Sequence, residues 1–445
     1  MQGDLLQQSM SGIKKHITAR RVSLGFILFV AGMMLLSTII PQEMDTAPAQ
    51  LNAWRQGHGG ILWLIDFAHL QRVYAQPWFA IAILGAAISL GVSAWDQFAV
   101  AGKRLHGTGI VSADEIASNV SRQQVGGIAK LHRYQPIAVK SEGHLKFVKS
   151  PWGYYGNGLL HIGMVLAVSA SLYVALTGRQ GSLVLVEGET SGNMLSWTHS
   201  EQGLIANPLE MPGSVRLDKV TVQFDGKNQP SLVSSDISII KPANKIDRIT
   251  STINTITKYQ GMRVYHAAQY GDAFTLEFVD ANGTQHLEKI PIQQPAGLTK
   301  AGYGDFDLNW SPYILSAKYV PDADHKSMTS NNPLLTLRLL DGEREMARVN
   351  LVRNSTSVLG PYQVRLLNVE KWSKLIFVDV SGMPLVFAGF AVIMLGGLIH
   401  YLSPPRELIA IRHSDDCYRV YWKAPSFSAF FVEERYELAT ALTGC

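Results

Sequence analysis

Four long apolar stretches interrupt an otherwise polar chain of 445 residues. They cover residues 22–40, 78–97, 157–176 and 384–402. Each is close to the ~20 residues that an α-helix needs to cross a hydrocarbon core of ~30 Å. The pattern therefore predicts a multi-span α-helical membrane protein with four transmembrane helices.

The long polar segment between the third and fourth stretches, residues 177–383, has the pattern of β-strands. Its apolar residues occur in short β-branched or alternating runs that are separated by turn residues. Asp280–Gly283 and Asp341–Gly342 are hairpin signals, because Asn-Gly and Asp-Gly accept the positive φ of tight turns. We expect an all-β domain, either a sandwich or a barrel, with junctions to the flanking helices at Gly178–Gln180 and Lys371–Lys374. The expected strands are Gly181–Val186, Val215–Phe224, Leu232–Ile240, Met262–Tyr270, Phe274–Val279, Leu334–Leu340, Arg348–Val352 and Tyr362–Val369.

Positive charges are concentrated in three of the short segments outside the apolar stretches. These are the N-terminal segment (residues 1–21), the second loop (98–156) and the C-terminal tail (403–445), whereas the first loop (41–77) has only Arg55 and Arg72. The positive-inside rule predicts that both termini and the second loop are cytoplasmic. The first loop and the β domain would then lie on the periplasmic, extracytoplasmic side of the cytoplasmic (inner) membrane. The basic residues before the first stretch are Lys14, Lys15, Arg20 and Arg21, and the second loop includes Lys103 and Arg104.

The overall composition narrows the classes of protein. A net charge of +4 without a dense basic stripe of interleaved aromatics predicts no nucleic-acid partner. The first apolar stretch is longer than the 7–15 residues of a signal-peptide core, which favours an uncleaved anchor. The two cysteines, Cys417 and Cys445, lie in the predicted cytoplasmic tail, where thiols stay reduced. Without a Cys-x-x-Cys motif, the chain is neither a thioredoxin-like redox protein nor a covalently haem-bearing cytochrome c.

His161 is the strongest candidate for chemistry, because it lies about one turn inside the third apolar stretch. An ionisable residue in a membrane helix indicates a functional site, and neutral imidazole is a good iron ligand. The alternative is a histidine that reaches headgroups or a backbone carbonyl. Gly163 nearby would leave room for a flat macrocycle or for a partner helix.

Two further features leave alternatives open. His400 lies near the end of the fourth stretch, at a depth similar to His161, so a bis-histidine haem site is one interpretation. The other is an ordinary interface residue, because Tyr401 and the helix-ending Ser403-Pro404-Pro405 that follow are typical of a membrane interface. The apolar-aromatic segment Ile61–Phe67 suits an interfacial helix, or a docking surface for another membrane subunit. The remaining histidines in the first loop and the β domain lack metal-ligand spacing; they are His58, His69, His199, His266, His286 and His325.

Several motifs, taken in order, resemble those of the ResB/CcsB family, and the resemblance covers nearly the whole chain. Ser37–Gln42 is similar to the family's G-T-x-I-P-Q motif at the end of its first span. The last apolar stretch opens like the family's D-P-G-x-P-x-V-Y-x-G-F pattern. The other residues that carry the resemblance are Leu64–Phe67, Val73, Tyr74, Pro77–Phe79, Asp218–Phe224, Gly226, Ser235–Ile237, Asp379, Gly382, Pro384, Gly389, Phe390 and Gly396.

The resemblance implies a role in System II cytochrome c maturation, with a CcsA/ResC-type membrane protein as partner and apocytochrome c as substrate. Together the two subunits would move haem outward and present it for attachment. Thiol-reducing proteins of the pathway and the lipid bilayer are further implied partners. The implied cofactor is haem b, held transiently and without a covalent bond, and His161 matches the family's haem-ligating histidine. We therefore expect a non-catalytic or co-catalytic subunit of a holocytochrome c synthase complex.

Some residues depart from the family's pattern. Asp379-Val380-Ser381-Gly382 replaces Asp-Pro-Gly, and Pro404-Pro405-Arg406-Glu407 replaces P-H-R-R. A tryptophan-rich motif is missing from the sequence, which excludes the fused two-part form. Two alternative functions stay open: a b-type haem electron-transfer subunit that uses His161 and His400, and a haem-free assembly scaffold.

Overall fold

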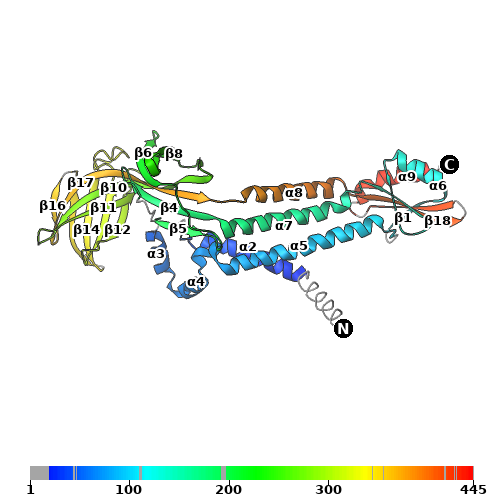
Figure 1. Ribbon diagram of the computed structural model, residues 1–445, viewed down its shortest axis with the longest axis horizontal. Coiled ribbons are helices and arrows are strands. Elements are labelled where there is room, and N and C mark those ends of the chain that lie inside the picture. Colours follow the sequence, from blue (N-terminus) through cyan, green and yellow to red (C-terminus); the bar gives the residue numbers. More distant parts are fainter. Residues whose placement is uncertain are drawn as a thin grey trace. The chain divides into compact units, whose positions relative to one another are not determined.

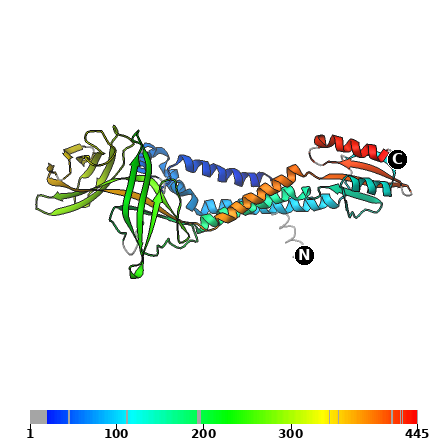
Figure 2. The same cartoon turned by 90° about the horizontal axis from the view of Figure 1, so that it is seen from above.

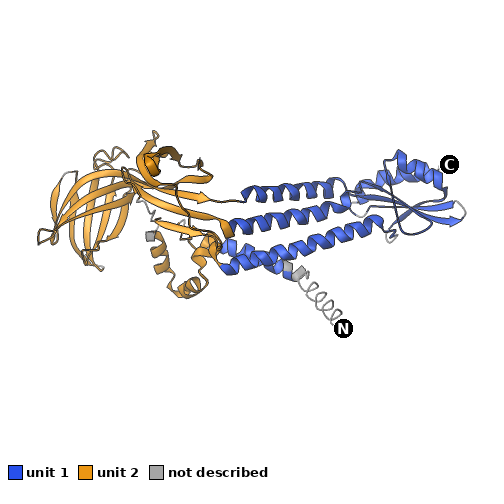
Figure 3. Cartoon of the chain, in the orientation of Figure 1, with its two compact units in different colours: residues 1–36, 77–175, 382–445 blue, residues 37–76, 176–381 orange. Residues whose placement is uncertain are grey.

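The computed structural model describes residues 20–43, 46, 48–109, 113–191, 197–342, 344–353, 355–414, 417–424, 426 and 428–443. Lys14, Lys15 and Cys445, which were used above, lie outside the described residues. The chain forms two compact units (Figure 3), the first from residues 1–36, 77–175 and 382–445 and the second from residues 37–76 and 176–381. Each unit is built from segments that are distant in the sequence.

The described helices agree broadly with the apolar pattern. In the first unit they are α2 (Arg20–Ile39, which ends in the second unit), α5 (Pro77–His106), α6 (Arg122–Leu131), α7 (Gly153–Thr177), α8 (Met383–Leu402), η4 (Ser428–Phe431) and α9 (Val432–Thr443). In the second unit they are α3 (Pro48–Gly57), η1 (Gly59–Ile61), α4 (Leu62–Ala68), η2 (Leu70–Ala75) and η3 (Pro242–Asn244).

Three of these helices, α5, α7 and α8, are long and apolar enough to cross a membrane. They confirm the predicted second, third and fourth apolar helices, and α5 continues nine residues beyond the predicted end at residue 97. Helix α2 is apolar over the shorter range Leu24–Ile39, so the first span stays a prediction. Figures 1 and 2 show α7 and α8 running beside each other.

Helices α7 and α8 pack closely because glycines face each other at intervals of seven residues. A Cβ atom built on Gly163 would lie 2.5 Å from the backbone nitrogen of Ile393, and one on Gly389 would lie 2.6 Å from that of Ala167. Gly156 and Gly396 are equally crowded by backbone atoms of the opposite helix. Small residues at such positions let two membrane helices approach closely and gain van der Waals contact.

The second loop and the C-terminal tail fold together into a small domain, which the sequence analysis did not predict. Its strands pair in the order β1-β19-β18-β3-β2. Helices α6 and α9 cover this sheet, and buried residues such as Val125, Trp422 and Leu438 form the core. The strands are β1 (Asp114–Ser121), β2 (Gln135–Ile137), β3 (His144–Lys149), β18 (Arg406–Ser414) and β19 (Cys417–Lys423).

A buried ion pair lies where this sheet meets the end of α5. The side chains of Lys146 and Glu407 are 0% and 6% exposed, and the ammonium lies 2.9 Å from a carboxylate oxygen. Lys146 also donates to the backbone oxygens of Arg104 at 2.8 Å and Gly107 at 2.7 Å, while the Tyr154 hydroxyl donates to Glu407. The ammonium therefore uses its three donors on the carboxylate and on carbonyls that the helix end leaves unpaired.

The large all-β region of the second unit is confirmed, and it consists of three sheets. The strand orders are β11-β10-β17-β4-β5 with β9 and β16 added, β12-β13-β14-β15, and β6-β7-β8. The expected strands Met262–Tyr270 and Phe274–Val279 are parts of one strand, β10. The strands are β4 (Arg179–Val186), β5 (His199–Gln202), β6 (Ser214–Phe224), β7 (Pro230–Ile240), β8 (Ile246–Thr252), β9 (Thr257–Tyr259), β10 (Met262–Val279), β11 (Gln285–Gln293), β12 (Gly302–Asp307), β13 (Ile314–Val320), β14 (Leu334–Asp341), β15 (Arg344–Leu351), β16 (Thr356–Leu359) and β17 (Tyr362–Asp379).

Two 18-residue strands, β10 and β17, form the centre of the β region because they contribute to two separate cores. One core lies between the β12–β15 sheet and the paired C-terminal half of β10 and N-terminal half of β17, and it includes Phe274 and Leu337. The other core lies between the β6–β8 sheet and the paired N-terminal half of β10 and C-terminal half of β17, and it includes Val264 and Ile237. Each core is thus shared between the central sheet and one of the two smaller sheets.

The predicted junction at Lys371–Lys374 is wrong. These residues lie inside β17, which pairs without interruption with β4 from Trp372 to Asp379. The boundary between the two units falls at Ser381 and Gly382 instead. A long strand continues through this polar stretch because Lys371 finds a partner in Asp272, which is 1% exposed and lies 3.0 Å away.

His266 lies in β10 beside a bulge between the two cores. Its ring is buried, its Nδ1 atom is 2.7 Å from the oxygen of Ala267, and its Nε2 atom has no hydrogen-bond partner among the described residues. Burial lowers the pKa of this imidazole below its ordinary value of 6.5. The folded domain therefore binds this proton less readily than the unfolded chain.

We expect Gly389→Ala to destabilise the packing of α7 and α8 by about 1–3 kcal/mol, because the new methyl group would collide with backbone that cannot move aside. The measurement is the unfolding midpoint of the detergent-purified protein. Gly397→Ala is the matched control in the same helix, since a Cβ there meets nothing within 4 Å. Equal midpoints for the two variants would contradict the close contact.

We expect the β domain to lose stability as the pH falls below about 6.5, because the unfolded chain then takes up a proton that His266 refuses. One such proton lowers the free energy of unfolding by at most about 1.4 kcal/mol per pH unit. Chemical unfolding at pH 7.5 and 5.5 should show a smaller pH effect in His266→Phe than in wild type. The exposed His325 provides the control: if His325→Asn removes as much of the pH effect, His266 is not its source.

Candidate functional site

His161 lies in the third turn of α7, partly buried, with its ring orientation fixed by the helix itself. Its Nδ1 atom is 2.9 Å from the backbone oxygen of Asn157, one turn earlier. Because a carbonyl oxygen can only accept, Nδ1 carries the proton and donates it. The second nitrogen, Nε2, then keeps its lone pair. A neutral imidazole held at one nitrogen by a carbonyl is the arrangement that metal-binding histidines use.

Two amide side chains lie next to His161 and connect α7 to α5. The Asn157 amide donates to the Gln97 side-chain oxygen at 2.8 Å. Asn157 and His161 are four residues apart and therefore share one face of α7. In an apolar helix pair such amides satisfy each other, since lipid offers no hydrogen-bond partner. Gln97, Asn157 and His161 thus form a small polar group among apolar helices.

Gly163 packs directly against α8. The sequence left two interpretations of this glycine, room for a flat macrocycle or room for a partner helix, and the contact selects the second. Gly163 is crowded by Ile393 and Gly389, so the space beside it belongs to a partner helix and not to a macrocycle. Two residues turn an α-helix by about 200°, so His161 faces away from α8, toward the side that carries Asn157.

His400 lies near this group but not on it. The backbone of His400 is level with Gly156, which places it five residues, or about 7.5 Å of helix rise, from His161. Its ring packs edge-on against Tyr401, with centroids 4.9 Å apart. A pocket of about 70 Å³ is lined by His400, Gln97 and Asn157, and His161 is not among the described residues that line it. This pocket therefore does not join the two histidines among the residues that the structure describes.

The Ser37–Gln42 motif attaches the end of α2 to η2. The Ser37 hydroxyl is 2.6 Å from that of Tyr74, and the Gln42 amide donates to the oxygens of Ile40 and Leu70 at 2.9 and 3.1 Å. The contacts of Ser37 and Gln42 fix the path of the first loop between α2 and η2.

The residues that open the last apolar helix also have structural roles. Asp379 accepts two hydrogen bonds from the Arg179 guanidinium, at 2.9 and 2.8 Å, where β17 and β4 end together. Gly382 has a φ of +98° and precedes α8 as its N-cap, and Pro384 lies in the first turn. A positive φ favours glycine, and proline suits the first turn because its missing N–H is not needed there.

The apolar-aromatic segment of the first loop is helical, as predicted. Trp63 and Phe67 of α4 are 70% and 82% exposed, and Arg55 holds the helix through two hydrogen bonds of 2.9 Å to Asp66. A position at the membrane interface stays a prediction. Cys417 is a free thiol on β19.

The sequence analysis missed Gln97 and Asn157. Their signal was an amide at the edge of each of two apolar stretches, but an amide alone does not indicate its partner. The 2.8 Å contact exists only because α5 and α7 pack side by side.

Three apolar helices, one of them with a fixed histidine, and a large β region between the last two of them define the class: a membrane protein with an inserted all-β region. The chain belongs to the ResB-like family, whose model matches residues 20–366. It is similar to the cytochrome c biogenesis protein CcsB of Gloeobacter violaceus, at 23% identity over 86% of this chain and 81% of the relative. The protein of the same name from Prochlorococcus marinus (strain NATL1A) is 21% identical over 93% of this chain and 94% of the relative.

Proposed function

We propose that this chain is a membrane subunit of cytochrome c maturation by the System II route. Two observations support the proposal: membership of the ResB-like family, and similarity to CcsB relatives that are matched over more than four fifths of their own length. In this role the subunit works with a CcsA/ResC-type membrane protein and presents haem b to apocytochrome c outside the cytoplasm. Thiol-reducing proteins of the pathway keep the apocytochrome cysteines in the reduced, thiol form.

The proposed topology has four spans in the cytoplasmic membrane. Both termini and the small sheet domain are cytoplasmic, and the large β region is extracytoplasmic. The distribution of charge supports this orientation, since Lys103, Arg104 and His106 end α5, whereas Arg55 and Arg72 are the basic residues of the first loop.

His161 is the proposed axial ligand of the haem iron. The observation that carries this assignment is the 2.9 Å hydrogen bond from Nδ1 to the Asn157 oxygen, which leaves Nε2 as the ligand atom. Bound haem supplies the iron and the vinyl groups that cytochrome c maturation uses. Within this chain, the backbone of α7 orients the imidazole, and Asn157 with Gln97 fixes α7 against α5.

A group of the partner subunit would complete the haem site in this proposal. His161 faces away from α8, and the described lining of the pocket at His400 does not include it. A site completed by a partner also fits a haem that is held only transiently, because separation of the subunits removes one ligand.

We expect haem in the purified complex of this chain with a CcsA/ResC-type protein, and a loss of at least five-fold in His161→Ala. The readouts are the visible spectrum with haem quantified as its pyridine complex, and the yield of holocytochrome c. His161→Gly with added imidazole should recover part of the spectrum, because free imidazole replaces the missing ligand. His400→Ala is the matched control and should keep its haem.

The other outcomes select the alternatives. Haem in the isolated chain that depends equally on His161 and His400 would identify a b-type electron-transfer subunit. Complexes without haem, together with normal holocytochrome yield in His161→Ala, would identify an assembly scaffold. Either result would refute the shared site.

A further inference from the structure

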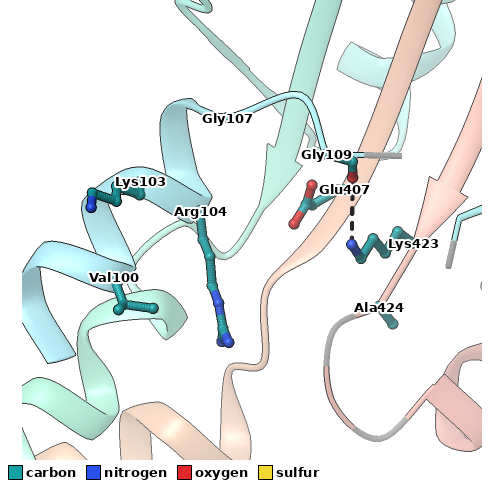
Figure 4. Close-up of a pocket in the computed structure, with 8 residues that line it drawn as sticks. All are labelled: Val100, Lys103, Arg104, Gly107, Gly109, Glu407, Lys423 and Ala424. Atoms are coloured by element: carbon teal, nitrogen blue, oxygen red, sulfur yellow. Dashed lines mark hydrogen bonds between the residues drawn. The ribbon is translucent and has the colours of Figure 1, made fainter. Parts of the chain in front are cut away.

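A basic pocket lies where α5 ends against the small sheet domain. Its volume is about 600 Å³, within the range of about 300–1,000 Å³ that ligand sites occupy. Figure 4 shows Arg104 on α5 and Lys423 on β19 on opposite sides of it. All of its lining residues belong to the first unit: Val100, Lys103, Arg104, Gly107, Gly109, Glu407, Lys423 and Ala424.

The charge of this pocket favours an anion. Three of the lining side chains are cationic, and the carboxylate of Glu407 is already paired with the buried Lys146 at 2.9 Å. Lys423 donates to the Gly109 oxygen at a long 3.4 Å. Within the described ranges, the side chains of Lys103 and Arg104 make no hydrogen bond or ion pair. Their charges are therefore available to a ligand.

The length of α5 places this pocket at headgroup level. Its 30 residues extend about 45 Å, which exceeds the ~30 Å hydrocarbon core by about 15 Å. Arg104 lies seven residues, or about 10 Å, beyond the end of the apolar stretch at residue 97. Long basic side chains at this distance reach back to lipid phosphates, and basic pockets at the ends of membrane helices bind anionic headgroups.

The lining also distinguishes a phosphate from a porphyrin. Val100 and Ala424 are the two apolar side chains among the described lining residues, and the others are charged side chains or glycines. A small, strongly charged group matches it better. The planar fork of Arg104 suits two phosphate oxygens, and the ammonium of Lys423 supplies a point charge opposite.

We propose that this pocket binds the phosphate headgroup of an anionic phospholipid, with Arg104 and Lys423 as its ligands and Lys103 at its rim. A headgroup in this position connects α5 to β19. Anionic lipid should therefore stabilise the small sheet domain against the membrane helix.

The test uses the full-length protein, delipidated and reconstituted into nanodiscs of phosphatidylcholine with or without phosphatidylglycerol. Native mass spectrometry counts retained lipids, and the unfolding midpoint reports stabilisation. We expect wild type to retain phosphatidylglycerol at least five-fold over phosphatidylcholine, and Arg104→Gln/Lys423→Gln to lose this preference. Arg122→Gln/Lys130→Gln removes the same charge from exposed positions of α6 and should keep it.

Three results would overturn the proposal. Equal retention of the two lipids by wild type would exclude an anionic-lipid site. Inorganic phosphate alone giving the same stabilisation would identify a site for a soluble phosphate. Binding of haemin that falls in the Arg104/Lys423 double variant, without change in lipid retention, would identify a porphyrin carboxylate site. Arg104→Gln alone serves if the double variant does not fold, because within the described residues this exposed side chain makes no hydrogen bond or ion pair that the change would remove.

The proposal is separable from the role of His161. His161→Ala should lose haem from the complex and keep the lipid preference, whereas the Arg104/Lys423 variant should do the reverse. A result in which both variants lose both ligands would show one shared site and refute the separate headgroup site.

Discussion

Close glycine packing between α7 and α8 is the constraint on which the rest of the structure depends. Gly156 and Gly163 on one helix meet Gly396 and Gly389 on the other with no space for a side chain. Each helix continues directly into strands at both ends, and these strands pair with each other: β3 with β18, and β4 with β17. The glycines recur at seven-residue intervals because that spacing places them on one face of each helix, where the two backbones meet.

The same packing explains where polar groups are tolerated. With one face of α7 occupied by α8, polar residues are confined to the face toward α5, where Asn157 finds Gln97 and His161 finds a backbone oxygen. Beyond the apolar stretch, the buried Lys146 pairs with Glu407 and with the last carbonyls of α5. Lys146 and Glu407 thus form a buried ion pair at the end of α5, whereas the imidazole of His161 lies within α7.

Much of the fold was predictable, because each feature had a local signal. Apolar length marked α5, α7 and α8, and alternation with turn residues marked half of the strands of the β region. The small sheet domain was not predictable, since its strands come from residues 114–149 and 406–423 and neither set forms a sheet alone. The junction at Lys371–Lys374 was placed wrongly because a run of polar residues resembles a loop until Asp272 is seen beside Lys371.

The sequence by itself determined the class of protein and the family resemblance, and it singled out His161 as a candidate, because hydrophobic length, motif order and an imidazole in an apolar helix are all local properties. Only the tertiary structure decided that Nδ1 of His161 meets the Asn157 oxygen, that Gly163 faces a helix, and that His400 lines a pocket with Gln97 and Asn157. It also brought Arg104 and Lys423, more than three hundred residues apart, to one pocket. Such facts depend on contacts between distant segments, and no single segment of the sequence encodes them.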